Sequence, residues 1–264
     1  MQKKQISILV IFLALFTASC AGVNINISVT PSLPKPATKQ PIDALPQTAA
    51  FKTPEDAITA YFAGIEQNDP SKILQACAIT EMSENFKFDL WTERLGGVMQ
   101  LATSLSPSNA PLYVELNKIQ LSDQLLRQVR NFAYALLSSE PVDFTVITKV
   151  DPERVNKFMA DINPKRLAGL AIKKITLPNK TLMQSPKYIE NATKSAKVYG
   201  ADELTERVVL FSFEQSDYVV GFTLLRYGEN WKIQQQSSPL GNTTALGTPE
   251  KTTEAEFDNK TSGD

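Results

Sequence analysis

The spacing of apolar residues changes about three quarters of the way along this chain. Up to residue 200, apolar side chains recur every three or four positions, which is the period of an amphipathic helix. Beyond that point, the stretches ERVVLFSFEQ and YVVGFTLLRY are rich in β-branched and aromatic residues, as strands are. Asp217 is expected in the turn between them, and Gly228 begins a second turn before the strand WKIQQQ. Helices followed by an antiparallel sheet predict an α+β fold in which the helices pack on one face of the sheet.

Two helices are expected at the start of the folded part. Thr53 can cap the first helix, Pro54 suits its first position, and two acidic residues follow at the positive end of the helix dipole. Residues 68–70 (Asn-Asp-Pro) end that helix and begin another, which carries Cys77 as a small core residue.

The middle of the chain is predicted to be mainly helical. Residues 122–137 carry one apolar stripe, and a helix within FKFDLWTERLGGVMQLATSL is expected to break at its glycine pair. Further helices are expected from Asp151 and over residues 185–200. The stretches PVDFTVITKV and IKKIT read as short strands.

The strand pattern also predicts which face of the sheet meets the helices. Side chains alternate along a strand, so Val209, Phe211 and Phe213 share one face, and Val208, Leu210 and Ser212 share the other. The first set is bulkier and is expected to face the helices, with Ser212 toward water. The apolar residues expected to join it are Val220, Phe222, Leu224, Trp231 and Ile233 from the sheet and Ile58, Phe62, Leu125 and Val129 from the helices.

The chain begins with a basic segment and a short apolar run. Lys3 and Lys4 precede ISILVIFLALFTA, thirteen residues without a charge, and the small residue Ser19 leads into Cys20. Spanning a bilayer core takes about 20 apolar residues. A basic region, a short apolar region and small residues before a cleavage site are typical of a secretory signal peptide.

This arrangement resembles the lipobox of bacterial lipoproteins, although Thr17 stands where that family usually has leucine. The resemblance implies that the Cys20 thiol receives a diacylglyceryl group, that a peptidase cuts just before it, and that fatty acids such as palmitate hold the protein in the membrane. The protein would then be exported and lipid-anchored to the bacterial cell membrane, with its domain outside the cytoplasm. A secreted protein cut near Ala18 and an uncleaved membrane anchor are the alternatives.

Composition divides the chain into four segments. Residues 1–19 are expected to form the signal peptide and residues 20–52 a proline-rich tether, with an α+β domain over 53–240 and a disordered tail over 241–264. Without the two early lysines the chain carries 25 basic and 28 acidic residues, a net charge of −3, which provides no basic field for nucleic acid.

Two stretches resemble the nuclear-transport-factor-2-like superfamily, which includes ketosteroid isomerase and many bacterial lipoprotein domains. They are TPEDAITAYFAGIEQNDPSKILQACA, similar to that family's opening helix pair, and VVGFTLLRYGENWKI, similar to its closing hairpin. The resemblance implies a cone of curved sheet wrapped around helices, with a pocket at its mouth. The segment 85–203 is longer and more helical than the family's, so either it holds a large insertion or the fold is only distantly related. Cystatin-like folds are a near alternative.

Candidate chemical groups are few. The chain has no histidine, which excludes a Ser-His-Asp triad and a histidine metal cluster, and no Gly-rich phosphate loop is present. The resemblance implies an acid inside the cone, and the candidates are Asp89, Glu93 and Glu214, beside Trp91 and Tyr218. None of them matches a known catalytic position of that family. No catalytic, cofactor-binding or metal-binding residue is therefore assigned, and Cys20 is the one assigned site.

A single basic cluster stands out in the sequence. Lys165, Arg166, Lys173 and Lys174 could contact anionic lipid headgroups, but a solvated surface is the preferred interpretation.

The sequence therefore predicts an envelope lipoprotein whose domain binds a protein partner or a small ligand without catalysis. The alternative is a pocket enzyme of the isomerase-like kind that uses acidic residues, which would show a deep pocket with an acid of raised pKa at its floor.

Overall fold

A computed structural model describes residues 50–95, 105–140 and 151–262. The chain divides into two compact units, residues 1–43 and 44–264, and all described residues belong to the second. Within the described residues, every helix is too short or too polar to cross a bilayer. The segment 141–150, expected as a strand, and Cys20 lie outside the described residues.

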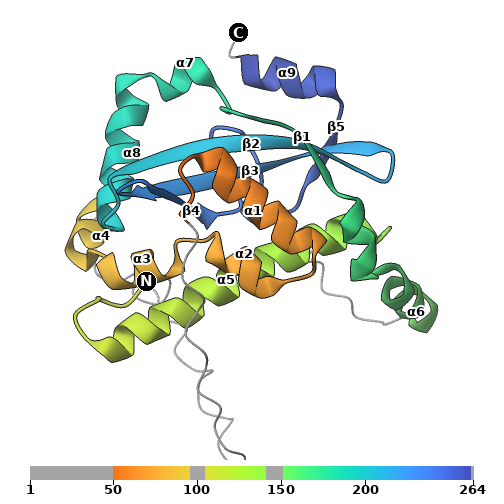
Figure 1. Ribbon diagram of the computed structural model, residues 1–264, viewed down its shortest axis with the longest axis horizontal. Coiled ribbons are helices and arrows are strands. Elements are labelled where there is room, and N and C mark those ends of the chain that lie inside the picture. The colour runs from red at the N-terminus through yellow and green to blue at the C-terminus, as the bar shows by residue number, and fades with distance from the viewer. Residues whose placement is uncertain (1–49, 96–104, 141–150, 263–264) are drawn as a thin grey trace, which may run out of the picture. The chain divides into compact units, whose positions relative to one another are not determined.

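A five-stranded antiparallel sheet forms the centre of the described unit (Figure 1). The strand order is β1-β2-β3-β4, with β5 pairing beside β3, and the strands are β1 (Ala171–Thr176), β2 (Glu203–Phe213), β3 (Ser216–Tyr227), β4 (Asn230–Gln235) and β5 (Glu250–Thr252). The register shifts at Ile172/Lys174 between β1 and β2, and at Thr223/Leu224 between β3 and β4. Such irregularities bend strands and increase their twist, which gives the sheet its curvature.

The helices confirm the α+β fold. They are α1 (Pro54–Glu66), α2 (Pro70–Gln75), α3 (Ile79–Asn85), α4 (Phe88–Leu95), α5 (Pro111–Leu137), α6 (Pro152–Asp161), α7 (Lys180–Met183), α8 (Pro186–Val198) and α9 (Glu254–Ser262), with a 3₁₀ helix at Pro164–Gly169. Helix α1 begins as its sequence predicts, because Thr53 and Asp56 form a reciprocal capping box. Helix α5 begins eleven residues before the predicted start at residue 122, with Pro111 at its first position.

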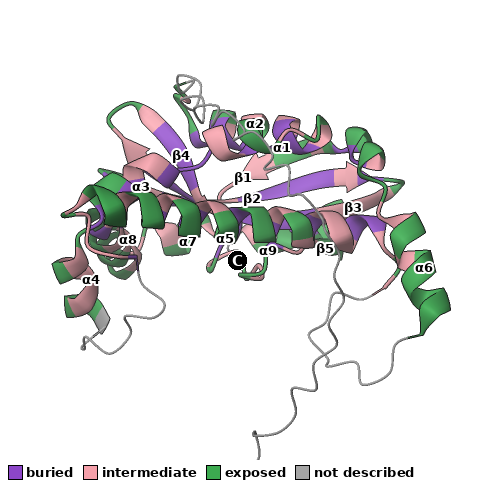
Figure 2. Ribbon diagram, turned by 90° about the horizontal axis from the view of Figure 1, so that it is seen from below, coloured by how far each residue is buried: buried purple, intermediate pink, exposed green. Residues whose placement is uncertain are grey.

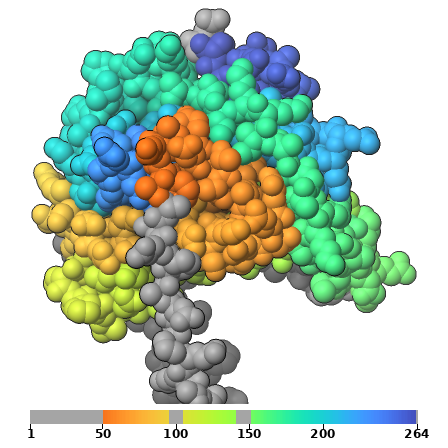
Figure 3. Space-filling model, in the orientation of Figure 1, coloured from red at the N-terminus to blue at the C-terminus, as the bar shows by residue number. Residues whose placement is uncertain are grey.

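The main core lies between the sheet and the first helices. Ile58 and Phe62 of α1 and Leu125 of α5 join the bulky strand face that carries Val209 and Phe211 in one buried cluster. Figure 1 shows α1 crossing the front of the sheet, and Figure 2 shows the buried residues concentrated along the strands. The space-filling view in Figure 3 shows the outer surface of α1 and α2 on this side. The prediction of which strand face meets the helices is therefore confirmed.

The outer edge of β4 is covered by backbone from the start of the domain. The amide of Trp231 donates to the carbonyl of Phe51 at 2.8 Å, and the amide of Ile233 donates to the carbonyl of Ala76 at 2.9 Å. Ala78 donates back to the carbonyl of Ile233 at 2.8 Å. An edge strand with unpaired backbone groups is a template for aggregation, so these contacts protect β4.

The disordered tail predicted for residues 241–264 is wrong for the part that the structure describes. Residues 250–252 form β5 against Asp217–Val219 of β3, and α9 follows with its own capping box between Thr253 and Glu256. Phe257 is 1% exposed and forms a second buried cluster with Val208, Leu210 and Val219 on the other face of the sheet. One large apolar side chain, an edge strand and a helix cap therefore contribute to ordering a segment whose composition alone predicts disorder.

Two smaller expectations also differ from the structure. Asp217 lies in β3 and pairs with Ser212, while Glu214 and Gln215 make the turn with positive φ angles of 43° and 67°. Ser212 is half-buried rather than open to water, because β1 pairs alongside it through Ala171.

Candidate ligand cavity

A cavity of about 630 Å³ lies between α4, α8, the sheet and the loop after β4. Its walls come from Trp91 and Arg94 of α4, from the face of α8 that carries Tyr188 and Ala192, and from Glu206 of β2. A smaller hollow of about 100 Å³ lies toward α3 and α5 and shares Trp91, Tyr199, Gln234 and Gln235 with the larger cavity. Ligand sites are concave regions of this size with a few polar groups among apolar ones.

Aromatic side chains form one wall of the cavity. Phe88 and Trp91 are three residues apart on α4, so they share a helix face, and their rings stack at 6.3 Å between centroids. Phe86 lies 6.4 Å from Trp91 and 5.9 Å from Tyr199, both measured between ring centroids. Trp91 and Tyr199, which line the cavity, are therefore packed against other aromatic rings.

A buried carboxylate lines the cavity on the sheet side. Glu206 is 4% exposed. Its Oε2 accepts hydrogen bonds from the Ser238 hydroxyl at 2.6 Å and from the Leu240 amide at 2.9 Å. Its Oε1 accepts one longer bond, 3.3 Å, from the Tyr188 hydroxyl of α8. These bonds tie β2 to the loop that follows β4 and to α8.

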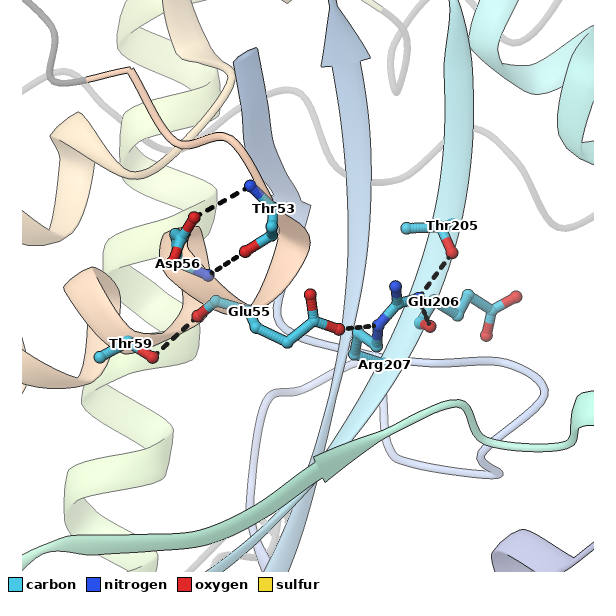
Figure 4. A network of polar contacts seen from close by, with 7 residues as sticks. All are labelled: Thr53, Glu55, Asp56, Thr59, Thr205, Glu206 and Arg207. Atoms are coloured by element: carbon cyan, nitrogen blue, oxygen red, sulfur yellow. Dashed lines mark hydrogen bonds and ion pairs between the residues drawn. The ribbon is translucent and has the colours of Figure 1, made fainter. Parts of the chain in front are cut away.

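Strand alternation explains how Glu206 comes to face the cavity while its neighbour does not. Arg207 projects to the opposite face, where its Nε donates to Glu55 of α1 at 2.6 Å and its Nη1 donates to the Thr205 hydroxyl at 2.8 Å (Figure 4). The Arg207 charge is therefore neutralised by Glu55 on the α1 side of the sheet.

The tyrosines of the cavity remain protonated. Burial raises the pKa of the Tyr188 hydroxyl, and the negative charge of Glu206 raises it further, against a smaller opposing effect of Arg207. Burial likewise raises the pKa of Tyr199, although a hydrogen bond with Gln234 and the charge of Arg94 act in the other direction. Arg94 itself is exposed and donates to the Ser195 hydroxyl at 2.6 Å.

The structure places one of the five candidate residues in the cavity. Trp91 lines it, whereas Asp89 and Glu93 are exposed on α4. Glu214 lies in the β2–β3 turn and receives two hydrogen bonds of 2.7 Å from Arg166, and Tyr218 stacks on Phe211 at 5.7 Å between ring centroids. These three acids are not brought together with Trp91 in a site.

Sequence reasoning missed Glu206, the acid that does line the cavity. The available signal was its place on the strand, because alternation puts Glu206 on the same face as the apolar residues Val208 and Leu210. An acid on an apolar strand face is less common than one on a solvated surface.

The predicted basic cluster is largely neutralised. Arg166 pairs with Glu214, Lys173 with Asp217 at 2.8 Å and Lys174 with Asp258. In the described part of the chain, no group of three or more acidic, cysteine or histidine side chains is arranged to hold a metal ion.

Neither a protein-family model nor a curated protein matches this chain. Among solved structures, the chain is similar to a cystatin-like protein from Ruminococcus gnavus ATCC 29149, with a TM-score of 0.49 and 19% sequence identity. The similarity covers 80% of this chain and 43% of that protein, so this chain spans less than half of that protein's length.

Proposed function

We propose that this chain is a bacterial envelope lipoprotein, anchored through lipid on Cys20, whose domain binds a small ligand in the cavity without catalysis. The observation that carries the binding role is the cavity itself, in which Trp91 and Tyr199 form a packed aromatic wall and Glu206 is held by three hydrogen bonds. Groups held in place before the ligand arrives are typical of binding sites, because little ordering remains to be done on binding.

The anchoring role rests on the N-terminal sequence. Lys3 and Lys4, the apolar run and Cys20 occur in the order that a lipidation signal requires. Each buried methylene of an acyl chain contributes about 0.8 kcal/mol, so two or three chains hold a protein durably. The domain would lie outside the cytoplasm, within the reach of the 29 residues that separate Cys20 from residue 50.

The anchor is tested by metabolic labelling. Wild-type chain expressed in a bacterium should incorporate radioactive palmitate and fractionate with membranes. Cys20→Ser should lose the label and retain the uncut signal segment, whereas Cys77→Ser, the matched control at the other cysteine, should label normally. A labelled Cys20→Ser chain would rule out the anchor.

The binding role is tested by filling the cavity. Ala192 lines the cavity, and the adjacent Thr193 is exposed and does not. Native mass spectrometry of wild-type chain from envelope extract should show a bound small molecule, which Ala192→Trp should lose and Thr193→Trp should keep. An identical bound species in both variants, or none in the wild type, would contradict the proposal.

A pocket enzyme of the isomerase-like kind is the second candidate, because Glu206 lines the cavity as an acid would in such an enzyme. Its Oε2 is occupied by two structural donors, which favours a role in recognition and loop anchoring over proton transfer. Incubating the ligand from envelope extract with the protein distinguishes the two candidate functions. An enzyme would convert the ligand, whereas a binding domain would leave it unchanged.

A further inference from the structure

Glu206 differs from the other carboxylates of the described residues in being buried while it lacks a cationic partner. It is the only aspartate or glutamate among the described residues that is buried, and no lysine or arginine nitrogen of those residues lies within 4.0 Å of its carboxylate. Its three donors are two hydroxyls and one backbone amide, all neutral. A buried charge without a counter-charge is costly, so the cavity favours a ligand that supplies one.

The carboxylate also has room for another donor. An ionised carboxylate offers about four acceptor positions, and the Oε1 atom uses one of its two for a 3.3 Å bond from Tyr188. Tyr188 and Glu206 both line the cavity, which is the side from which a further donor would approach this oxygen.

The walls around this oxygen suit a cation with a carbon skeleton. The ring faces of Trp91, Tyr188 and Tyr199 carry negative electrostatic potential, which attracts ammonium groups, and they pack well against methylenes. Arg94 is the one cation on the cavity wall, but its guanidinium is exposed and engaged with Ser195, so solvent screens its charge.

We infer that the cavity binds a small organic ammonium cation, with an N–H of the ammonium donated to Glu206 Oε1 and the carbon skeleton against Trp91 and the two tyrosines. This inference rests on the proposed function, because it assigns a ligand class to the same cavity. Anions are excluded as ligands of this cavity, because the Glu206 carboxylate repels them.

Three probes of matched shape and different charge test the inference. Phenethylammonium, 2-phenylethanol and 3-phenylpropanoate are titrated into full-length chain, and their dissociation constants are measured by ligand-observed NMR. Phenethylammonium should bind at least about tenfold more tightly than the alcohol, since hydrogen bonds to charged groups are the stronger class. The carboxylate probe should bind least. Equal affinities, or no binding of the ammonium, would overturn the inference.

Two variants connect the preference to Glu206. Glu206→Gln should abolish the preference for the ammonium, whereas Glu203→Gln, an exposed glutamate on the same strand that pairs with Arg226, should keep it. If Glu206→Gln does not fold, Tyr188→Phe decides, because it removes the donor to Oε1 and should preserve or strengthen ammonium binding. A preference that persists in Glu206→Gln, or that Tyr188→Phe abolishes, would overturn the inference.

The cavity-filling experiment separates this inference from the proposed function. If wild-type chain carries a neutral or anionic molecule that Ala192→Trp excludes, the binding role stands and the ammonium class is wrong.

Discussion

At the scale of single residues, alternation along β2 decides which contacts each side chain makes. Phe211 is fully buried and lies 5.4 Å from Phe62 and 5.4 Å from Phe132 between ring centroids, whereas its neighbour Ser212 is half-buried on the other face. Phe211→Ala should therefore lower the unfolding free energy by about 3 to 5 kcal/mol. Ser212→Ala should change it by less than about 0.5 kcal/mol. Urea melts of the two variants check this, and a larger loss for Ser212→Ala would contradict the register.

Lys232 is a buried basic residue that makes the stability of the protein depend on pH. It is 0% exposed, its Nζ donates to the Gln75 carbonyl at 2.6 Å and lies 4.9 Å from the centroid of the Phe51 ring. Burial lowers its pKa, and the charges of Glu81 and Cys77 only partly oppose this. The unfolded chain therefore binds the proton more tightly than the folded one, so this residue makes stability rise with pH on the alkaline side.

The prediction for Lys232 follows from that sign. Between its lowered folded pKa and the ordinary lysine value of about 10.4, the free energy of unfolding of the wild type should rise with pH more steeply than that of Lys232→Met. Denaturant melts from about pH 8 to pH 10 measure both slopes. The exposed Lys260→Met should keep the wild-type slope, and equal slopes for Lys232→Met would mean that the native state does not disfavour the charge.

At the scale of elements, regular patterns could be predicted and single contacts could not. Helix α1 and the hairpin β2–β3 follow from a cap signal and from long apolar periods, which are local properties of the sequence. Strand β5 and helix α9 depend on one side chain, Phe257, reaching a site formed by residues some 40 positions earlier. Glu206 combines the two cases, because alternation along β2 places it on the apolar face, whereas its partners Ser238 and Leu240 are distant in sequence and could not be predicted.

Helix α9 should consequently depend on Phe257. Phe257→Ala removes the only buried residue of α9, so β5 and α9 should detach while β2 and β3 stay folded. Hydrogen exchange should show lost protection at Thr252 and Phe257 amides and retained protection at Phe211. The exposed Lys260→Ala serves as control and should change neither set. Uniform loss of protection would mean that the tail is integral to the core.

Helix α5 carries an exposed apolar face that its sequence also encodes. Leu112, Leu116 and Ile119 are 66%, 47% and 67% exposed and recur at helical spacing. Replacing all three by Gln should change the unfolding free energy by less than about 0.5 kcal/mol per residue and reduce the fluorescence of a bound hydrophobic dye. Leu125→Gln, at a buried position of the same helix, should be strongly destabilising. A large loss of stability in the triple variant would show that this face is covered.

At the scale of the whole described unit, β2 and β3 are shared by two apolar clusters on opposite faces. The larger joins the sheet to α1, α3 and α5, and the smaller joins it to α9. Cys77 belongs to the larger cluster, where it is 3% exposed and burial raises the pKa of its thiol, with Lys232 partly opposing. Burial and the raised pKa both make the thiol unreactive in the native state. The rate at which a reagent labels Cys77 therefore reports opening of the main core.

Thiol labelling of Cys77 should therefore distinguish the two clusters. In a Cys20→Ser background Cys77 is the only thiol, and a reagent in excess reacts with it only when the core opens. Phe211→Ala lies in the same cluster and should accelerate labelling by a factor on the order of 10² to 10⁴, matching its loss of unfolding free energy. Phe257→Ala should accelerate labelling much less, because detaching α9 leaves the cover over Cys77 in place. Equal acceleration by both variants would show that the two faces of the sheet open together, and that α9 is as essential to the native state as α1.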